Sequence, residues 1–213
     1  MTVELALLSR VSYGSLEITG SRLQGLLALL AEDPHVGCSA ARLVDALWPD
    51  EQPEHPVKAL QILVSRARAR LGPGVIVSTP SGYRLSLRED QIDASAVLLR
   101  AHESEKRSQA GDHLAALGYA EAGLALCEGV EGWDTGPGDP LSALRAARLP
   151  AYRSLLRARA AAGPTVAASL RSSSARTSSS RGLRSISSPS SPAASARRPR
   201  RDIASARART SDR

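Results

Sequence analysis

The chain of 213 residues contains two cysteines, one methionine and no phenylalanine, and aromatic residues make up only 3% of it. Cys38 and Cys127 lie far apart in the sequence and no CxxC pair occurs, which argues against a disulfide framework and against a thiolate zinc or redox site. So little cysteine is typical of a reducing compartment, and we expect a cytoplasmic location. Lysine occurs only at Lys58 and Lys106, which we interpret as a composition bias toward arginine.

The sequence also lacks membrane segments and the common catalytic motifs. No apolar run approaches the ~20 residues that span a bilayer, and the first twenty residues lack the basic start of a signal peptide. GxSxG and HExxH are absent, and the glycines between Gly129 and Gly138 are not followed by the GK[ST] of a phosphate-binding loop. No metal-ligand spacing connects the four histidines, His35, His55, His102 and His113. We therefore expect no enzyme activity, no cofactor, no metal and no membrane partner.

The net charge of +7 is distributed unevenly along the chain. Residues 164–213 hold 11 arginines and two aspartates, which leaves 17 basic and 19 acidic residues in 1–163. The body is therefore slightly acidic, and a uniformly basic nucleic-acid coat is excluded. Any basic binding surface in the body must be local.

Hydrophobic periodicity predicts short strands and then three helices in the first 72 residues. Apolar and polar residues alternate over 3–7 and 16–18, with a turn at 13–15 between the two runs. Ser21 and Gln24 have the spacing of a capping box, which predicts the start of the first helix. The second and third helices are predicted at 39–48 and 56–71, with Ser39 as a cap and Pro56 in the first turn.

The following segments predict a hairpin and then a helical unit. The hairpin strands are predicted at 75–77 and 83–87 around the turn 78–82. Asp93 is predicted to cap the next helix, and Pro150 to kink or break the last one. The helices of this unit are predicted at 93–109, 111–127 and 141–162. The leucines expected to supply their packing faces are Leu98, Leu99, Leu114, Leu117, Leu124 and Leu126.

The last 50 residues differ in composition from the rest of the chain. Residues 164–213 contain fifteen serines and no aromatic residue. Such a segment cannot bury enough apolar area to offset the entropy of ordering it, so we expect a disordered tail over 163–213.

The helix predicted at 56–71 is the most informative element. Its apolar residues fall on one face: Leu60, Leu63, Val64, Ala67 and Leu71. Its other face carries cations and hydrogen-bond donors, with no acidic residue between Lys58 and Arg70. Arginine can pair with guanine and glutamine with adenine, while the other cations hold phosphates, so the pattern suits a helix that reads the major groove. An ordinary helix with a solvated cationic face is the alternative.

The order of elements and four sequence stretches point to a known family. These stretches are RLVDALWPDEQP, ALQILVSRARARLG, SGYRL and QIDASAVLLRAHESEKRSQAGDHLAALGYAEAGLALCEG. Together they resemble the Streptomyces antibiotic regulatory protein family, whose members join an OmpR-like winged helix-turn-helix to a tetratricopeptide-like bacterial transcriptional activator domain. The resemblance covers roughly residues 3–162.

The resemblance implies an α+β protein with three parts. These are an OmpR-like winged-helix DNA-binding domain (1–88), a partial all-α activator domain (91–162) and the tail. The family's further helices beyond the position of Gly163 are missing here. The tail is either a cationic arm that adds nonspecific DNA affinity or the product of a reading-frame shift in a GC-rich gene.

The resemblance also implies a sequence-specific DNA-binding transcriptional regulator, usually an activator of secondary-metabolite gene clusters. Expected partners are double-stranded promoter DNA with direct repeats, RNA polymerase and a second copy of the chain on DNA. Positions expected to face DNA are Lys58, Gln61, Ile62, Ser65, Arg66 and Arg68 on the reading helix, and Thr79 and Ser81 on the wing. The alternative function is a truncated or inactive helical protein-interaction module without direct promoter activation.

One departure from the family pattern and three structural roles complete the expectations for the wing and its surroundings. Thr79 stands where OmpR-like wings often carry arginine, which argues against a strong wing contact. Gly82 is expected to permit the turn and Tyr83 to pack under the wing. Trp48 is expected to pack in the core.

Overall fold

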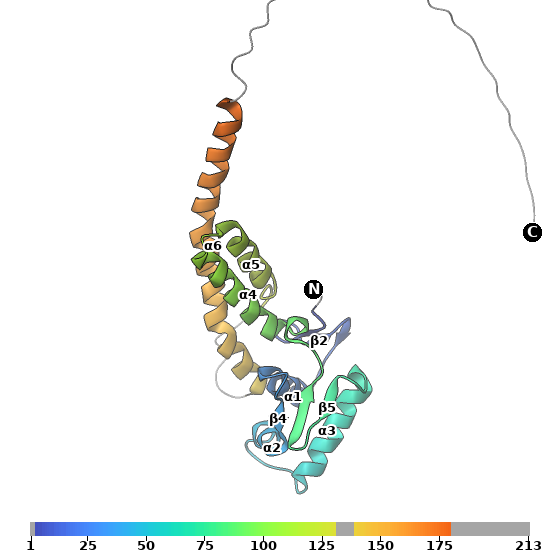
Figure 1. The fold of residues 1–213 in the computed structure, drawn as a ribbon. Coiled ribbons are helices and arrows are strands. Elements are labelled where there is room, and N and C mark those ends of the chain that lie inside the picture. Colours follow the sequence, from blue (N-terminus) through green and yellow to red (C-terminus); the bar gives the residue numbers. More distant parts are fainter. Residues whose placement is uncertain (1–2, 131–138, 180–213) are drawn as a thin grey trace, which may run out of the picture. The chain divides into compact units, whose positions relative to one another are not determined.

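The computed structural model describes residues 3–130 and 139–179. One compact unit runs from Met1 to Ser174 and therefore includes both expected domains (Figure 1). Among the described residues no helix is both long enough and apolar enough to cross a membrane. The glycines of 129–138 fall mostly in residues 131–138, which lie outside the described residues.

Three short antiparallel strands form a sheet near the N-terminus. β1 (Leu5–Ala6) pairs with β2 (Ser12–Tyr13), and β2 pairs with β3 (Leu16–Glu17). Gly14 lies in the tight turn between β2 and β3 with a φ of 55°, a conformation that favours glycine. The sequence predicts strands at the positions of β1 and β3 but not the separate β2, because Tyr13 is assigned there to the turn 13–15.

Three helices follow, close to the predicted ranges. They are α1 (Ser21–Glu32), α2 (Ala40–Leu47) and α3 (Pro56–Leu71). Ser39 caps α2 as predicted, since its Oγ accepts the backbone N–H of Arg42 at 3.3 Å. The three helices share one core, in which the largest fully buried side chains include Leu26, Leu27, Leu30, Leu43 and Leu60.

The start of α1 differs from the predicted capping box. Gly20 is the N-cap, with a φ of 100° and no side-chain cap, and Ser21 is the first helical residue. Gln24 instead donates from Nε2 to the carbonyl oxygen of Ile18 at 2.8 Å. The predicted capping box is therefore wrong. Gly20 can adopt a positive φ, which lets the chain turn into the helix without a side-chain cap.

A second antiparallel sheet has the strand order β4-β6-β5 and packs against the three helices. The predicted hairpin is present as β5 (Ile76–Ser78) and β6 (Gly82–Leu85). β4 (Cys38–Ser39) is an additional strand that pairs with β6. Three helices followed by a hairpin form the winged helix-turn-helix that the sequence predicts.

Gly82 is needed for close backbone packing, which corrects its expected role in the turn. A Cβ atom at Gly82 would lie 2.2 Å from the carbonyl oxygen of Cys38 in the neighbouring β4. Gly82 is also not among the glycines with positive φ, so the turn does not require its conformational freedom. Tyr83 is half-buried and packs against the core, as expected.

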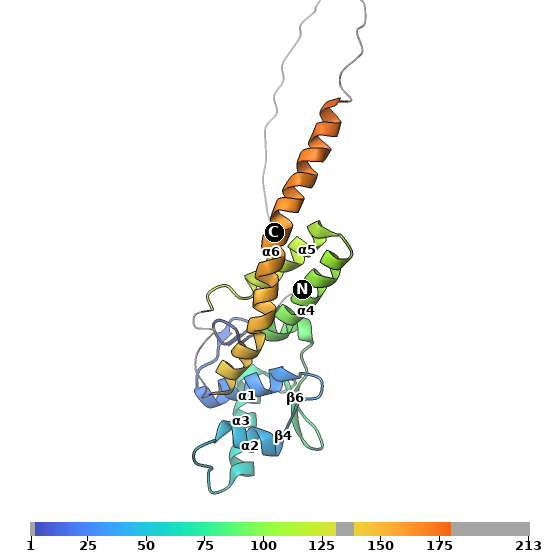
Figure 2. The ribbon, with the colours of Figure 1, turned by 90° about the vertical axis from the view of Figure 1, so that its left-hand side faces the viewer.

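The helical unit begins after the short 3-10 helix η1 (Glu89–Gln91). α4 (Asp93–Gln109) lies beside α5 (His113–Ala125) (Figure 1 and Figure 2). The buried residues of the pair are mostly small: Ala94, Val97, Ala101, Ser104, Ala116, Ala120 and Gly123. The prediction that Leu98, Leu99 and Leu114 supply packing faces is wrong, because all three are exposed. Helices in such close contact leave room only for small side chains between them.

Gly123 offers a test of this close packing. A Cβ atom there would lie 2.7 Å from Leu155 Cδ1 of the next helix and 2.9 Å from Arg100 Cβ of α4. We expect Gly123→Ala to lower the free energy of unfolding by about 1–3 kcal/mol through overpacking, measured by urea denaturation. Gly118→Ala on the same helix has nothing within 4 Å, so its gain in helix propensity should raise stability by ~0.5–1 kcal/mol. Equal changes in the unfolding free energy of the two variants would contradict the close packing around Gly123.

The last helix is longer than predicted and is not interrupted. α6 (Pro140–Ser179) continues through Pro150, so the predicted break there is wrong. The carbonyl of Ala146, which loses its helical N–H partner to Pro150, belongs to an exposed residue and can bond to water. The helical backbone also includes 164–179, so the predicted disorder is wrong for that stretch, while 180–213 lies outside the described residues.

The carboxylate of Asp93 connects the N-terminal sheet to the helical unit. Asp93 is 3% exposed and accepts the backbone N–H of Leu7 at 2.8 and 2.9 Å and that of Leu8 at 2.9 Å. The prediction that Asp93 caps α4 is wrong, because Ile92 is the N-cap and Asp93 is the first helical residue. The side chain is used instead by the segment after β1, 85 residues earlier in the chain.

Burial controls the protonation of Asp93. Removal from water raises the pKa of this carboxyl from its ordinary 3.8 to about 6. The backbone N–H groups of Leu8, Leu7 and Ala94 oppose the rise, and so does the positive charge of Arg145. The folded state therefore binds the Asp93 proton more tightly than the unfolded chain does.

This pKa predicts the direction of a pH dependence. The stability that Asp93 contributes is fully present below pH ~4 and is lost as the pH rises through about 6. Between pH 5 and 7.5 the wild type should lose about 1 kcal/mol more unfolding free energy than Asp93→Asn, which cannot titrate. Urea denaturation of both proteins at the two pH values measures the difference. If the unfolding free energies of the two proteins change with pH in the same way, Asp93 does not cause this pH dependence.

Candidate nucleic-acid interface

α3 is held in place by an apolar stripe and by residues at both ends. Pro56 occupies the first turn, where its missing N–H costs nothing, and Gly72 ends the helix with a φ of 108°. The buried stripe consists of Leu60, Val64, Ala67 and Leu71, as predicted, with Leu63 partly buried. This packing fixes which face of α3 is turned to solvent.

The opposite face of α3 presents five of the six predicted reading residues. Lys58, Gln61, Ile62, Ser65 and Arg66 are all exposed. Their spacing of three or four residues places them along one side of the helix over about two and a half turns. Among the described residues, none of these polar side chains has a hydrogen-bond or ion-pair partner, so their donors and charges are available to a ligand.

Arg68, the sixth predicted reading residue, has a different environment. Its Nε donates to the carbonyl oxygen of Ile76 at 2.9 Å, and its Nη2 donates to Ser78 Oγ at 3.0 Å. Its guanidinium carbon also lies 5.8 Å from the centre of the Tyr83 ring. Arg68 is therefore bound to the hairpin and is only half-exposed. The sequence could not reveal this, since the acceptors lie 8 and 10 residues further along the chain.

Arg70, in the last turn of α3, is also directed at the protein. Its Nη2 donates to the carbonyl oxygen of Glu17 in β3 at 3.3 Å. Both cations of the last turn therefore connect α3 to its surroundings, and the available positive charge on the exposed face comes from Lys58 and Arg66.

The hairpin tip contains the two predicted wing residues, Thr79 and Ser81, which differ in whether their side-chain hydroxyl is already hydrogen-bonded. Thr79 closes the turn, because its Oγ1 accepts the N–H of Gly82 at 3.0 Å and its own N–H donates to the Gly82 carbonyl at 2.9 Å. Ser81 is exposed, and its carbonyl accepts the N–H of Ala40 at 2.9 Å. The Ser81 hydroxyl is therefore the better placed of the two for contact with a ligand.

A shallow hollow lies on the exposed face of α3, here called the reading face (Lys58, Gln61, Ile62, Ser65 and Arg66). It contains a cation that the sequence pattern did not indicate. Arg22 of α1 and Arg66 of α3 both line it, together with Trp48 and Ile62. The Arg22 guanidinium lies 5.5 Å from the centre of the Trp48 ring, which is buried as expected. No local motif identifies Arg22, because its proximity to α3 depends on the folded helices.

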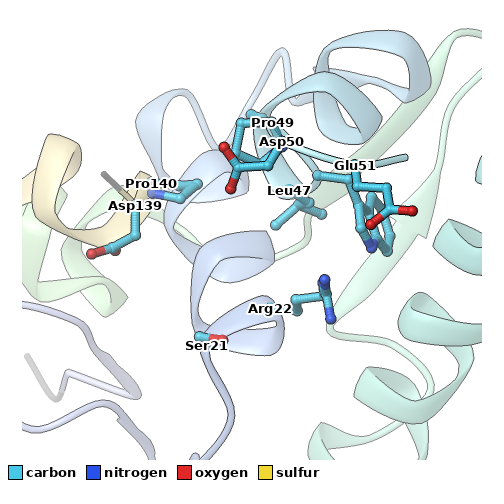
Figure 3. Close-up of a pocket in the computed structure, with 10 residues that line it drawn as sticks. Ser21, Arg22, Leu47, Pro49, Asp50, Glu51, Asp139 and Pro140 are labelled. Carbon is cyan, nitrogen blue, oxygen red and sulfur yellow. The ribbon is translucent and has the colours of Figure 1, made fainter. Parts of the chain in front are cut away.

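A second hollow, of ≈ 370 Å³, is also lined by Arg22 and has the opposite character (Figure 3). It is lined by three carboxylates, Asp50, Glu51 and Asp139, with Arg22 as its only cation. A polyanion would be repelled from its acidic side, so this hollow is distinct from the reading face. Among the described residues no group of three or more His, Cys, Asp or Glu is placed to hold a metal ion.

Comparison with known proteins finds regulators. The regulatory protein AfsR of Streptomyces coelicolor is 36% identical over 113 residues, which are 52% of this chain and 11% of AfsR. AfsR of Streptomyces griseus is 30% identical over 104 residues, 49% of this chain and 11% of that protein. The transcriptional regulator RedD of Streptomyces coelicolor is 30% identical over 148 residues, 64% of this chain and 42% of RedD. The chain thus spans less than half the length of each of these relatives.

The fold also has a solved counterpart. Mycobacterium tuberculosis EmbR, determined in complex with a low affinity phosphopeptide, superposes with a TM-score of 0.55 at 21% identity. The match covers 75% of this chain and 43% of EmbR, and at this identity it shows a shared fold. No family profile matches the chain.

Proposed function

This chain is a relative of the Streptomyces antibiotic regulatory protein family, as its sequence predicts, and on that premise we propose that it is a DNA-binding transcriptional regulator. The exposed face of α3 enters the major groove, and the hairpin β5–β6 flanks it. The protein acts in the cytoplasm, without enzymatic activity, on double-stranded promoter DNA.

The observation that carries this proposal is the unpaired polar face of α3. Lys58, Gln61 and Arg66 are exposed, and no acidic side chain interrupts the face. Burying such donors and cations against another protein surface would be costly without matched partners, whereas base edges and phosphates supply acceptors and negative charge along the groove. Arg66 suits a bidentate contact to guanine, Gln61 suits adenine, and Lys58 suits a phosphate.

The biological role follows from the relatives. We propose that the chain recognises direct repeats upstream of promoters in a secondary-metabolite gene cluster and activates transcription there by recruiting RNA polymerase. Two copies would occupy adjacent repeats.

Arg66 and Lys58 should respond differently to substitution. Arg66→Ala should weaken binding to the cognate site by about 1–3 kcal/mol and relax the preference at one base pair. Lys58→Ala should weaken binding to all sequences alike and reduce the salt slope by ~1. Fluorescence anisotropy with cognate and scrambled duplexes over a salt series measures both effects. If both variants bind the cognate duplex as tightly as wild type, α3 is not the reading helix.

A protein-interaction module without promoter activation is the second candidate. It is favoured by the exposed leucines of the helical unit, Leu98, Leu99 and Leu114. Footprinting on the DNA upstream of neighbouring genes separates the two candidates. Protection over repeats supports the regulator, while absence of any protected site together with a defined protein complex supports the interaction module.

A further inference from the structure

The guanidinium of Arg68 contacts both strands of the hairpin from the third helix. Its two hydrogen bonds reach Ile76 and Ser78 of β5, and its guanidinium carbon lies over the ring of Tyr83 in β6. Ser78 and Tyr83 are register partners in the β5–β6 ladder. One side chain of α3 therefore spans the paired strands at the end nearest the hairpin tip.

These contacts occupy one of the two pairs of parallel donors with which Arg68 could bind a base edge. A guanidinium has five N–H donors in a fixed plane, and bidentate recognition uses two that point the same way. The Nε and Nη2 groups of Arg68 form one such fork, and both already donate within the molecule. Arg66, two residues earlier, has no such partners among the described residues, and all of its donors are available.

Building on the function proposed above, we propose that Arg68 is a positioning residue, which sets the hairpin tip relative to the reading face and does not read a base. Contacts of α3 with bases and of the tip with the flanking backbone must form together on one rigid duplex. A hairpin held at a fixed distance from α3 has its contact geometry set before DNA arrives, which reduces the entropy lost on binding.

The fold of the hairpin does not depend on Arg68 alone. β6 also pairs with β4 through Cys38 and Tyr83, and the Ala40 N–H donates to the carbonyl of Ser81. An Arg68 variant should therefore keep the hairpin while allowing it greater movement.

The first test uses the protein without DNA. Hydrogen exchange of the Thr79 and Ser86 amides, which bond within or beside the hairpin, should be about tenfold faster in Arg68→Ala than in wild type. Arg70→Ala is the matched control, because it removes the same charge from the same turn but leaves the hairpin untouched. Unchanged exchange in Arg68→Ala would overturn the positioning role whether or not the protein binds DNA.

The second test uses DNA, with a set of duplexes substituted one base pair at a time. Arg68→Ala should bind all of them about tenfold more weakly, keep the wild-type base preferences and lose hydroxyl-radical protection where the hairpin lies. Ser78→Ala, which removes one acceptor and leaves Arg68 intact, should weaken the same protection. Relaxed preference at a single base pair in Arg68→Ala, with hairpin protection intact, would show that Arg68 reads a base and overturn the proposal. If the wild type itself shows no base preference, the proposed function fails, while the exchange test still decides the role of Arg68.

Discussion

Asp93→Ala should lower the free energy of unfolding by about 3 kcal/mol. The substitution leaves the backbone N–H groups of Leu7 and Leu8 buried without an acceptor, and each such loss costs about 1–3 kcal/mol. Water cannot easily replace the carboxylate, because Leu7 and Leu8 are fully buried.

The measurement is urea denaturation near pH 7, followed by far-ultraviolet circular dichroism. Asp45→Ala is a suitable control, since it removes an exposed carboxylate whose one partner among the described residues is Gln52. It should change stability by less than about 0.5 kcal/mol. An Asp93→Ala protein as stable as the control would mean that this carboxylate does not join the N-terminal segment to α4.

The same site connects three elements that belong to different predicted domains. Arg145 of α6 donates to the carbonyl oxygens of Leu7 and Ser9, and Arg148 of α6 donates to that of Ala94. Loss of the Asp93 carboxylate therefore weakens the place where the winged helix and the helical unit meet. We expect Asp93→Ala to unfold as a less cooperative protein, with a lower m-value than wild type.

Gly82→Ala should be nearly as damaging and should also affect DNA binding. The added Cβ atom would lie 2.2 Å from the carbonyl oxygen of Cys38 and 2.7 Å from the backbone nitrogen of Ala40. Backbone atoms on both sides cannot rotate away as a side chain can, so β4 and β6 must separate. We expect a loss of about 3 kcal/mol in unfolding free energy.

Gly74→Ala is the matched control for Gly82→Ala. Gly74 also lies beside the hairpin, has no positive φ and has nothing within 4 Å of an added Cβ atom. It should leave stability within about 0.5 kcal/mol of wild type. The folded fraction of Gly82→Ala should show faster amide exchange in β6 and weaker DNA affinity than Gly74→Ala. Indistinguishable behaviour of the two variants would contradict the close approach of β4 and β6.

Local signals explain which parts of the fold the sequence predicts well. Ser39, Pro56 and Gly72 mark helix ends through interactions within a few residues, and all three mark them in the structure. The buried stripe and the exposed face of α3 follow from helical periodicity, which needs no knowledge of the partners. The exposure of the residues from Lys58 to Arg66 was therefore predictable.

Contacts between residues that are distant in sequence are what the sequence does not reveal. Aspartate is a residue type that often caps helices, so Asp93 was predicted as a cap. Its partners Leu7 and Leu8 come close to it only in the folded protein. Arg68 has the spacing of a reading residue, but β5 supplies acceptors that satisfy it. Arg22 carries no motif and gains a place beside α3 only when α1 packs near it. Periodicity identifies the face of a helix but does not identify the neighbours of that face.

The central claim is that the exposed face of α3 reads a DNA sequence. Selection of bound duplexes from a random pool, carried out with the full chain and with Arg66→Ala in parallel, tests it most directly. The account predicts that the wild type enriches one motif and that Arg66→Ala enriches the same motif with one base pair no longer specified. Enrichment of no motif by the wild type, or of an identical motif by both proteins, would contradict the claim.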